Sequence, residues 1–156
     1  MSHVATEMML CACAWILHHE LAHIIAGDAG SDADGIDRER RADMAATEWV
    51  LGHAAAEPAL TKRGVGIAAA LVSITGYDLA FPRAASSRLT HPDASERINT
   101  CLSHVAFGAD HVTHQVAVDT LRLFVERFQV PVPPGPFENP SEALREYCVA
   151  LMRRPR

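Results

Sequence analysis

The chain has 156 residues, enough for one domain with a substantial hydrophobic core. Half of the residues are apolar but only 6% are aromatic, and Gly and Pro cluster between alanine-rich segments, which predicts helices joined by loops. The net charge of −5 and the absence of a basic block argue against nucleic-acid binding. The nine histidines are the most unusual feature of the composition.

We expect neither secretion nor a membrane span. Residues 8–17 are apolar but lack a basic start and a cleavage site, so we expect no signal peptide and a cytoplasmic location. Residues 64–81 approach the length of a membrane helix, but Asp78 and its neighbours shorten the apolar part. The cysteines form no Cys-x-x-Cys pair, and we expect reduced, mostly buried thiols rather than disulfides. They are Cys11, Cys13, Cys101 and Cys148.

The first predicted helix, residues 4–26, contains a His-Glu-x-x-His motif formed by His19, Glu20 and His23. Positions four apart lie on one helix face, so the two imidazoles can bind one Zn²⁺ ion. Glu20 is offset by about 100° around the helix, which places its carboxylate beside the metal as a general base. An ordinary amphipathic helix is the alternative. The apolar flanks favour a metal site, because burying such a cluster is costly unless something pairs it. The flanking residues are Trp15, Ile16, Leu17, Leu21, Ala22, Ile24 and Ile25.

A second helix, predicted for residues 36–56, carries Glu39 and Asp43 one turn apart. Residues 29–35 form a short turn before it, and the turn lacks the last glutamate of a calcium loop. A short turn permits an antiparallel helix pair, in which Glu39 becomes a third zinc ligand and Asp43 orients a ligand histidine. The alternative is a solvated face on which both carboxylates pair with arginines, Arg38 or Arg40.

Four more helices are expected, with no strand and no repeat. Residues 61–77 are apolar all round, as in a buried central helix, and Pro58 breaks the chain before it. A helix begins near Pro92 and runs through residue 107, followed by a helix at 112–128. After a proline-rich loop at 130–140, Ser141 caps a closing helix at 141–152. Three polar residues near position 111 invite a second-metal interpretation, which we do not favour. They are Asp110, His111 and His114.

Three blocks in this order resemble the glutamate-zincin metallopeptidases, which include the CAAX-prenyl and heat-shock membrane peptidases. The blocks are His19-Glu20-x-x-His23, Glu39-x-x-Ala42-Asp43, and Thr90-His91-Pro92 followed by Arg97. The chain is most similar to the bacterial phage-exclusion (Lit-type) peptidases, which share the tryptophan-containing run 14–17 and the Gly-Ile-Ala-rich helix at 66–71. The resemblance covers roughly residues 12–102.

The resemblance implies one zinc ion bound by His19, His23 and Glu39, with Glu20 as the catalytic base. It also implies that His91 and Arg97 reach the active site, where they stabilise the oxyanion; Tyr77 is the alternative donor. Phage-exclusion peptidases cut a host protein in response to infection. The implied substrate is therefore a protein or peptide.

One feature departs from the zincin pattern. Zincins place a β-strand before the metal helix, and its edge binds the extended substrate, whereas almost no sequence precedes the helix here. A partner, a missing N-terminal segment, or the helices alone must then hold the substrate. We therefore predict a mostly α, compact zincin-like domain spanning residues 1–156, built around a metal-binding helix pair. Its expected function is zinc-dependent proteolysis, and the alternative is a non-catalytic metal-binding regulatory or interaction module.

Overall fold

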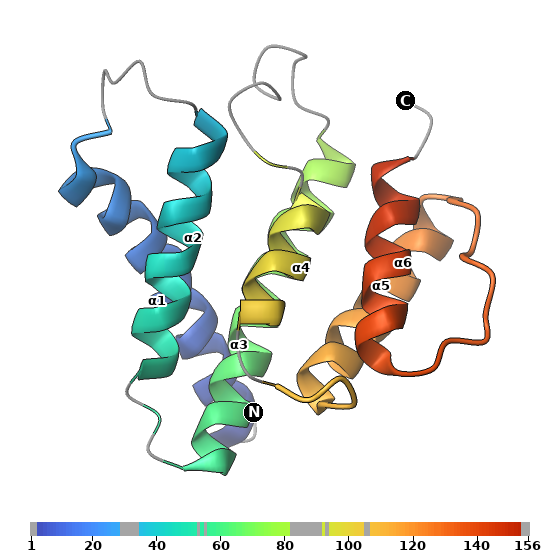
Figure 1. The fold of residues 1–156 in the computed structure, drawn as a ribbon, viewed down its shortest axis with the longest axis horizontal. Coiled ribbons are helices and arrows are strands. Elements are labelled where there is room, and N and C mark those ends of the chain that lie inside the picture. The colour runs from blue at the N-terminus through green and yellow to red at the C-terminus, as the bar shows by residue number, and fades with distance from the viewer. Residues whose placement is uncertain are drawn as a thin grey trace.

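The computed structural model describes residues 3–28, 35–52, 54, 56–81, 92, 94–104 and 107–153. These residues form helices and loops, and no strand occurs among them, which confirms the mostly α prediction. The six helices are α1 (His3–Ala26), α2 (Gly35–Gly52), α3 (Glu57–Ala80), α4 (Ala94–His104), α5 (Val112–Arg127) and α6 (Pro140–Met152). Figure 1 shows their order along the chain.

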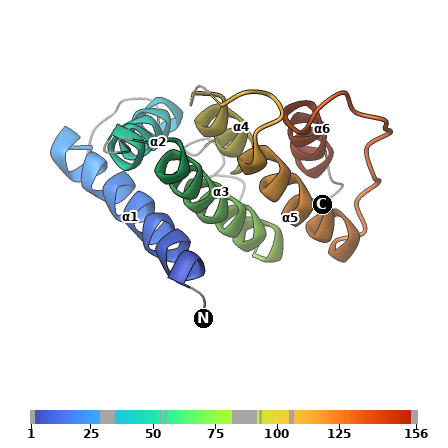
Figure 2. The ribbon, with the colours of Figure 1, turned by 90° about the horizontal axis from the view of Figure 1, so that it is seen from below.

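The helices lie in two layers, with α1, α3 and α5 in one and α2, α4 and α6 in the other (Figure 2). Helix α3 packs against α1, α2, α4 and α5 and is the centre of the fold. Ile67, Ala68 and Leu71 are at most 1% exposed, as predicted for a buried central helix. Gly66 lets α1 approach closely, because a Cβ at this position would lie 2.5 Å from the Cβ of Cys11.

Several predicted helix boundaries were wrong. Helix α2 ends at Gly52, and α3 begins at Glu57 with Pro58 in its first turn, where the fixed φ of proline suits a helix start. The helix expected to run through residue 107 ends at His104. At α6 the N-cap is Asn139 rather than Ser141, because the Asn139 side chain accepts a hydrogen bond from the backbone N–H of Glu142.

Helix α1 differs from α3 in its burial. Only Trp15 and His19 of its 24 residues are buried. By length and composition α1 is apolar enough to cross a membrane, whereas the run at 64–81 that raised this question in the sequence belongs to the core helix. The side of α1 that bears Trp15 and His19 packs against α2 and α3, whereas most of the remaining helix is exposed or half-buried.

Candidate metal centre

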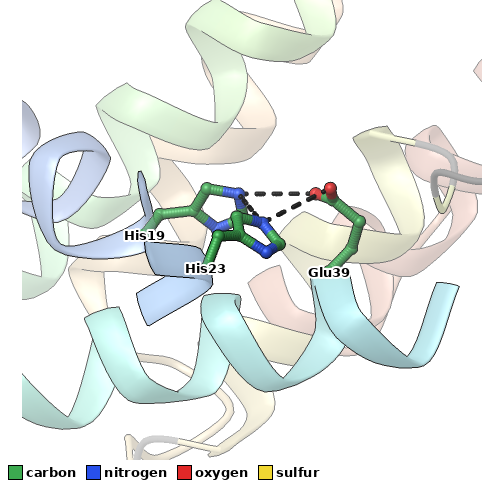
Figure 3. Close-up of side chains that lie close together, drawn as sticks. All are labelled: His19, His23 and Glu39. Carbon is green, nitrogen blue, oxygen red and sulfur yellow. Dashed lines mark hydrogen bonds and ion pairs between the residues drawn. The ribbon is translucent and has the colours of Figure 1, made fainter. Parts of the chain in front are cut away.

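Three side chains from α1 and α2 converge on one point (Figure 3). The Nε2 atoms of His19 and His23 lie 3.2 Å apart, and each is 3.4 Å from a carboxylate oxygen of Glu39. One ligand atom from each residue lies within 4.8 Å of the other two. The structure therefore brings together the three predicted metal ligands. Glu39 is only 8% exposed, so it does not belong to a solvated face.

The donor set fits a zinc ion. Two imidazole nitrogens and one carboxylate oxygen are the three protein ligands of several catalytic zinc sites, which leave a fourth position for water or substrate. Both histidines present Nε2 towards Glu39, so the two rings can bind one ion without flipping. Among the residues that the structure describes, no other group of histidine, cysteine and acidic side chains meets the same distance criterion.

The second ring nitrogen of each histidine contacts an aspartate. The His19 Nδ1 lies 2.9 Å from Asp43, as the sequence predicted, and the His23 Nδ1 lies 2.8 Å from Asp28. An Nδ1–H that donates to a carboxylate leaves Nε2 free to bind a metal and fixes the orientation of the ring. Each ring is therefore held by an acidic partner behind it.

Asp28 reaches His23 because of the way α1 ends. Gly27 adopts a left-handed conformation with φ +67°, and the backbone N–H of Asp28 donates to the carbonyl of His23 at 3.1 Å. This turn brings the Asp28 side chain back beside His23. Arg38 on α2 donates to the backbone oxygen of Asp28 at 2.8 Å, which fixes the turn against the second helix. In sequence, Gly27 and Asp28 only follow the predicted end of the helix at residue 26, so this role of Asp28 was not predicted.

Arg97 on α4 connects a third helix to the site. Its Nε and one terminal nitrogen donate to the two oxygens of Asp43 at 2.8 and 2.6 Å, the bidentate geometry of a strong ion pair. The same guanidinium lies 5.9 Å above the ring of Trp15 and is 6% exposed. Arg97 therefore lies at the site, where it pairs with Asp43 and its terminal nitrogen is also 3.8 Å from a carboxylate oxygen of Glu39. An additional contact with substrate stays a prediction.

The charges around His19 favour a cation at this position. Burial, the largest single effect, lowers the pKa of His19, but hydrogen bonds to Asp43 and Glu39 outweigh it and raise the pKa to about 9 from its ordinary value of 6.5. Burial likewise lowers the pKa of Arg97, and the ion pair with Asp43 more than reverses this effect. In the metal-free protein a proton on His19 adds to the positive charge of Arg97 beside the two carboxylates. A divalent cation can supply the same charge when the proton leaves.

A pocket of about 490 Å³ opens onto the three ligands. Its wall includes Glu20, the predicted base, Tyr77, the alternative oxyanion donor, and Arg97. Glu20 is exposed, so its carboxylate is accessible to water and substrate, and Tyr77 is 63% exposed. His91 lies outside the described residues. Of the three polar residues near position 111, His111 caps α5, because its side chain accepts a hydrogen bond from the backbone N–H of Thr113.

The fold and the site define a class: a helical domain in which a His-Glu-x-x-His helix and a carboxylate from the next helix form a candidate metal centre. The chain belongs to the peptidase U49 family, whose sequence pattern matches residues 1–117. It is 38% identical over 113 residues to the "Cell death peptidase" of Escherichia coli strain K12, an alignment that covers 71% of this chain and 37% of that protein. The chain thus spans less than half the length of this relative. No solved structure matches it.

Family membership supports the predicted resemblance to the Lit-type peptidases. The wider relation to the glutamate-zincins and to the CAAX-type peptidases stays a prediction, which rests on the order of the three sequence blocks.

Proposed function

We propose that the protein is a zinc-dependent endopeptidase that cuts a protein substrate in the pocket above His19, His23 and Glu39. The observation that carries the proposal is the convergence of these three ligands within 4.8 Å beside the exposed Glu20. Membership of a peptidase family supports the same reaction class. A bound zinc ion would act as a Lewis acid on the scissile carbonyl and would make water a better nucleophile.

The side chains around the ligands have distinct proposed roles. Glu20 accepts the proton of the attacking water and passes it to the leaving amine. Asp28 and Asp43 hold the rings of the two histidines, and Arg97 holds Asp43. These contacts fix the orientation of the two ligand histidines before substrate binds. Electrostatic catalysis requires such preorganisation.

The developing oxyanion needs a hydrogen-bond donor. Tyr77 lines the pocket with an exposed side chain and can donate its hydroxyl, whereas the Arg97 guanidinium, which lines the same pocket, is paired with Asp43. His91 remains the donor that the family resemblance implies. Loss of one such donor lowers turnover by roughly 10²–10³-fold. Separate His91→Ala and Tyr77→Phe variants, measured at equal zinc content, distinguish the two because only the true donor affects turnover this strongly.

We further propose that the substrate is held by a surface outside the described helices. The structure places no strand beside α1 among the residues that it describes, so strand addition to this domain has no visible template. A partner protein or a further segment would supply it. The resemblance of the sequence blocks to the phage-exclusion peptidases supports a role in phage defence, and we propose this role, in the cytoplasm, for the present protein.

The experiment that tests the proposal compares the parent with Glu20→Gln during expression in bacterial cells. Proteomic mapping of new N-termini should show cleavage products with the parent and none with Glu20→Gln, while both proteins bind zinc, because the substitution removes only the proton acceptor. Glu126→Gln, at an exposed site on α5, is the matched control and should behave like the parent. Zinc binding without cleavage by the parent would support the alternative, a non-catalytic metal-binding module.

A further inference from the structure

The residue one helical turn before His19 on α1 is Trp15, which is fully buried. Its indole ring stacks on the imidazole of His19, with the ring centroids 5.6 Å apart and the two planes 24° from parallel. Aromatic rings at this separation attract each other in an offset arrangement. The contact with Asp43 holds one edge of the His19 ring, and the contact with Trp15 restricts the plane of that ring.

The indole of Trp15 has one polar group, and that group bonds to Thr47 of α2. The Nε1–H donates to the Thr47 hydroxyl at 3.0 Å, and both residues are 0% exposed. An indole nitrogen can only donate, and a buried donor without an acceptor is costly, so this bond ties Trp15 to one position on α2. The Thr47 hydroxyl also interacts with the thiol of Cys101, which connects the bond to α4.

The bond between Trp15 and Thr47 is the first of three contacts that join α1 to α2 in one register. Each contact joins one turn of α1 to one turn of α2, and the numbering rises on α1 while it falls on α2, so the two helices are antiparallel. The pairs are Trp15–Thr47, His19–Asp43 and His23–Glu39. The first pair is neutral and fully buried, whereas the other two belong to the metal centre.

The register matters because a metal site tolerates little displacement. A slip of one residue moves a helix by about 1.5 Å along its axis. Zinc–ligand distances are held within about 0.2 Å of their preferred values. Two ligands come from α1 and one from α2, so the relative position of these helices decides whether all three reach one ion.

We propose that Trp15 and Thr47 are positioning residues of the metal centre, whose bond fixes the register of α1 on α2 and the plane of the His19 ring. Neither residue is one of the three ligands, and both act through His19. Arg97, which holds Asp43, lies 5.9 Å over the same indole, so Trp15 supports both contacts of that carboxylate. The proposal rests on the zinc binding of the proposed function and is independent of proteolysis.

The zinc affinity of Thr47 variants tests the proposal. Thr47→Val keeps the shape of the side chain but leaves the indole N–H without its acceptor. It should weaken zinc binding by about tenfold in competition with a zinc-chelating dye, the lower limit for loss of an orienting partner. Thr47→Ser keeps the hydroxyl and should bind zinc like the parent, although it loses a buried methyl group. Loss of packing alone predicts the opposite order, because Thr47→Val fills the site better than Thr47→Ser.

Thr75→Val is the matched control for removal of a buried hydroxyl. Thr75 is 3% exposed, and its hydroxyl donates to the carbonyl of Leu71 within the same helix at 2.9 Å. Its zinc affinity should equal that of the parent. Far-UV circular dichroism verifies that each variant keeps its helix content.

The visible absorption of the Co²⁺-loaded protein gives a readout that a change in stability alone does not move. Its bands depend on the geometry of the ligands around the ion. At saturating Co²⁺ the bands of Thr47→Val should differ from those of the parent in position or intensity, and Thr47→Ser should reproduce the parent.

A double variant tests whether the two residues act through their bond. Trp15→Phe keeps an aromatic ring but removes the N–H. Trp15→Phe combined with Thr47→Val should bind zinc no more weakly than the weaker of the two single variants, because the second change has no bond left to break. Losses that add fully would show that the residues act separately and would contradict the proposal.

The possible outcomes separate this proposal from the proposed peptidase. Thr47→Val that matches the parent in zinc affinity and Co²⁺ absorption would overturn the positioning role and leave the peptidase intact. A zinc-loaded parent that cleaves nothing would overturn only the peptidase, and a parent that binds no zinc would overturn both. If Thr47→Val does not fold, Trp15→Phe provides the same test, since parental zinc affinity in that variant equally refutes the positioning role.

Discussion

Asp28 offers the sharpest test of how the metal centre is built. Its carboxylate lies 2.8 Å from the Nδ1 of His23, and its side chain is only 13% exposed. Removing an orienting partner of a metal-binding histidine typically lowers metal affinity by 10–100-fold, or about 1.4–2.7 kcal/mol. We expect Asp28→Ala to reach this range and Asp28→Asn to lose less, because the amide oxygen can still accept the Nδ1–H bond but carries no charge. Arg38 binds the backbone oxygen of Asp28, so the turn remains fixed in both variants.

The assay for Asp28 is competition with a zinc-chelating dye at pH 7.5, with helix content verified by circular dichroism. Asp37→Asn is the matched control, because Asp37 is a nearby aspartate whose side chain is 67% exposed and pairs with Arg40 on the surface. Its zinc affinity should equal that of the parent. If Asp28→Ala binds zinc within a factor of about two of the parent, the contact with His23 does not position the ligand and the reasoning fails.

Three further predictions concern the same region. Glu39→Ala should weaken zinc binding more than Asp43→Ala in the same dye competition; the opposite order would exchange their roles as ligand and orienting residue. The pKa of His19 is raised to about 9 from an ordinary 6.5, so in EDTA its protonation should stabilise the folded protein fully below pH 6.5. This contribution should be lost as the pH rises to about 9. The melting temperature of His19→Gln should lack this pH dependence. Burial raises the pKa of Cys101 to about 12, so iodoacetamide at pH 8 should modify the exposed Cys13 and spare Cys101; labelling of Cys101 in the folded protein would contradict its burial.

The helical periods and the ligand spacing were predictable from sequence because both depend on local geometry. His19 and His23 lie four apart on a helix, and that alone aims their rings at one point. Glu39 was predictable as a ligand because only eight residues separate the end of α1 from the start of α2, which favours two adjacent helices. The helix ends were harder to predict. Pro58 was expected to break the chain, and instead it begins α3, because local signals at a proline are compatible with either outcome.

The outer contacts of the site depend on tertiary packing, which spacing along the chain does not reveal. Asp28 was overlooked because its role requires the left-handed turn at Gly27, although a glycine followed by aspartate after a ligand histidine was a usable signal. The pairing of Arg97 with Asp43 joins residues 54 positions apart and follows from the placement of α4 beside α2. The exposure of Leu17 and Ile24 on α1 was likewise not predictable, because an apolar helix looks the same in sequence whether or not another helix covers it.

Metal content measured after reconstitution with zinc tests the central claim most directly. Elemental analysis of the purified, dialysed parent should give about one zinc per chain, and His19→Ala and His23→Ala should give nearly none while they keep their helix content. His3→Ala, at an exposed histidine on the same helix, should retain the parental value. A folded parent that remains free of zinc after reconstitution would contradict the metal centre and, with it, the proposed peptidase.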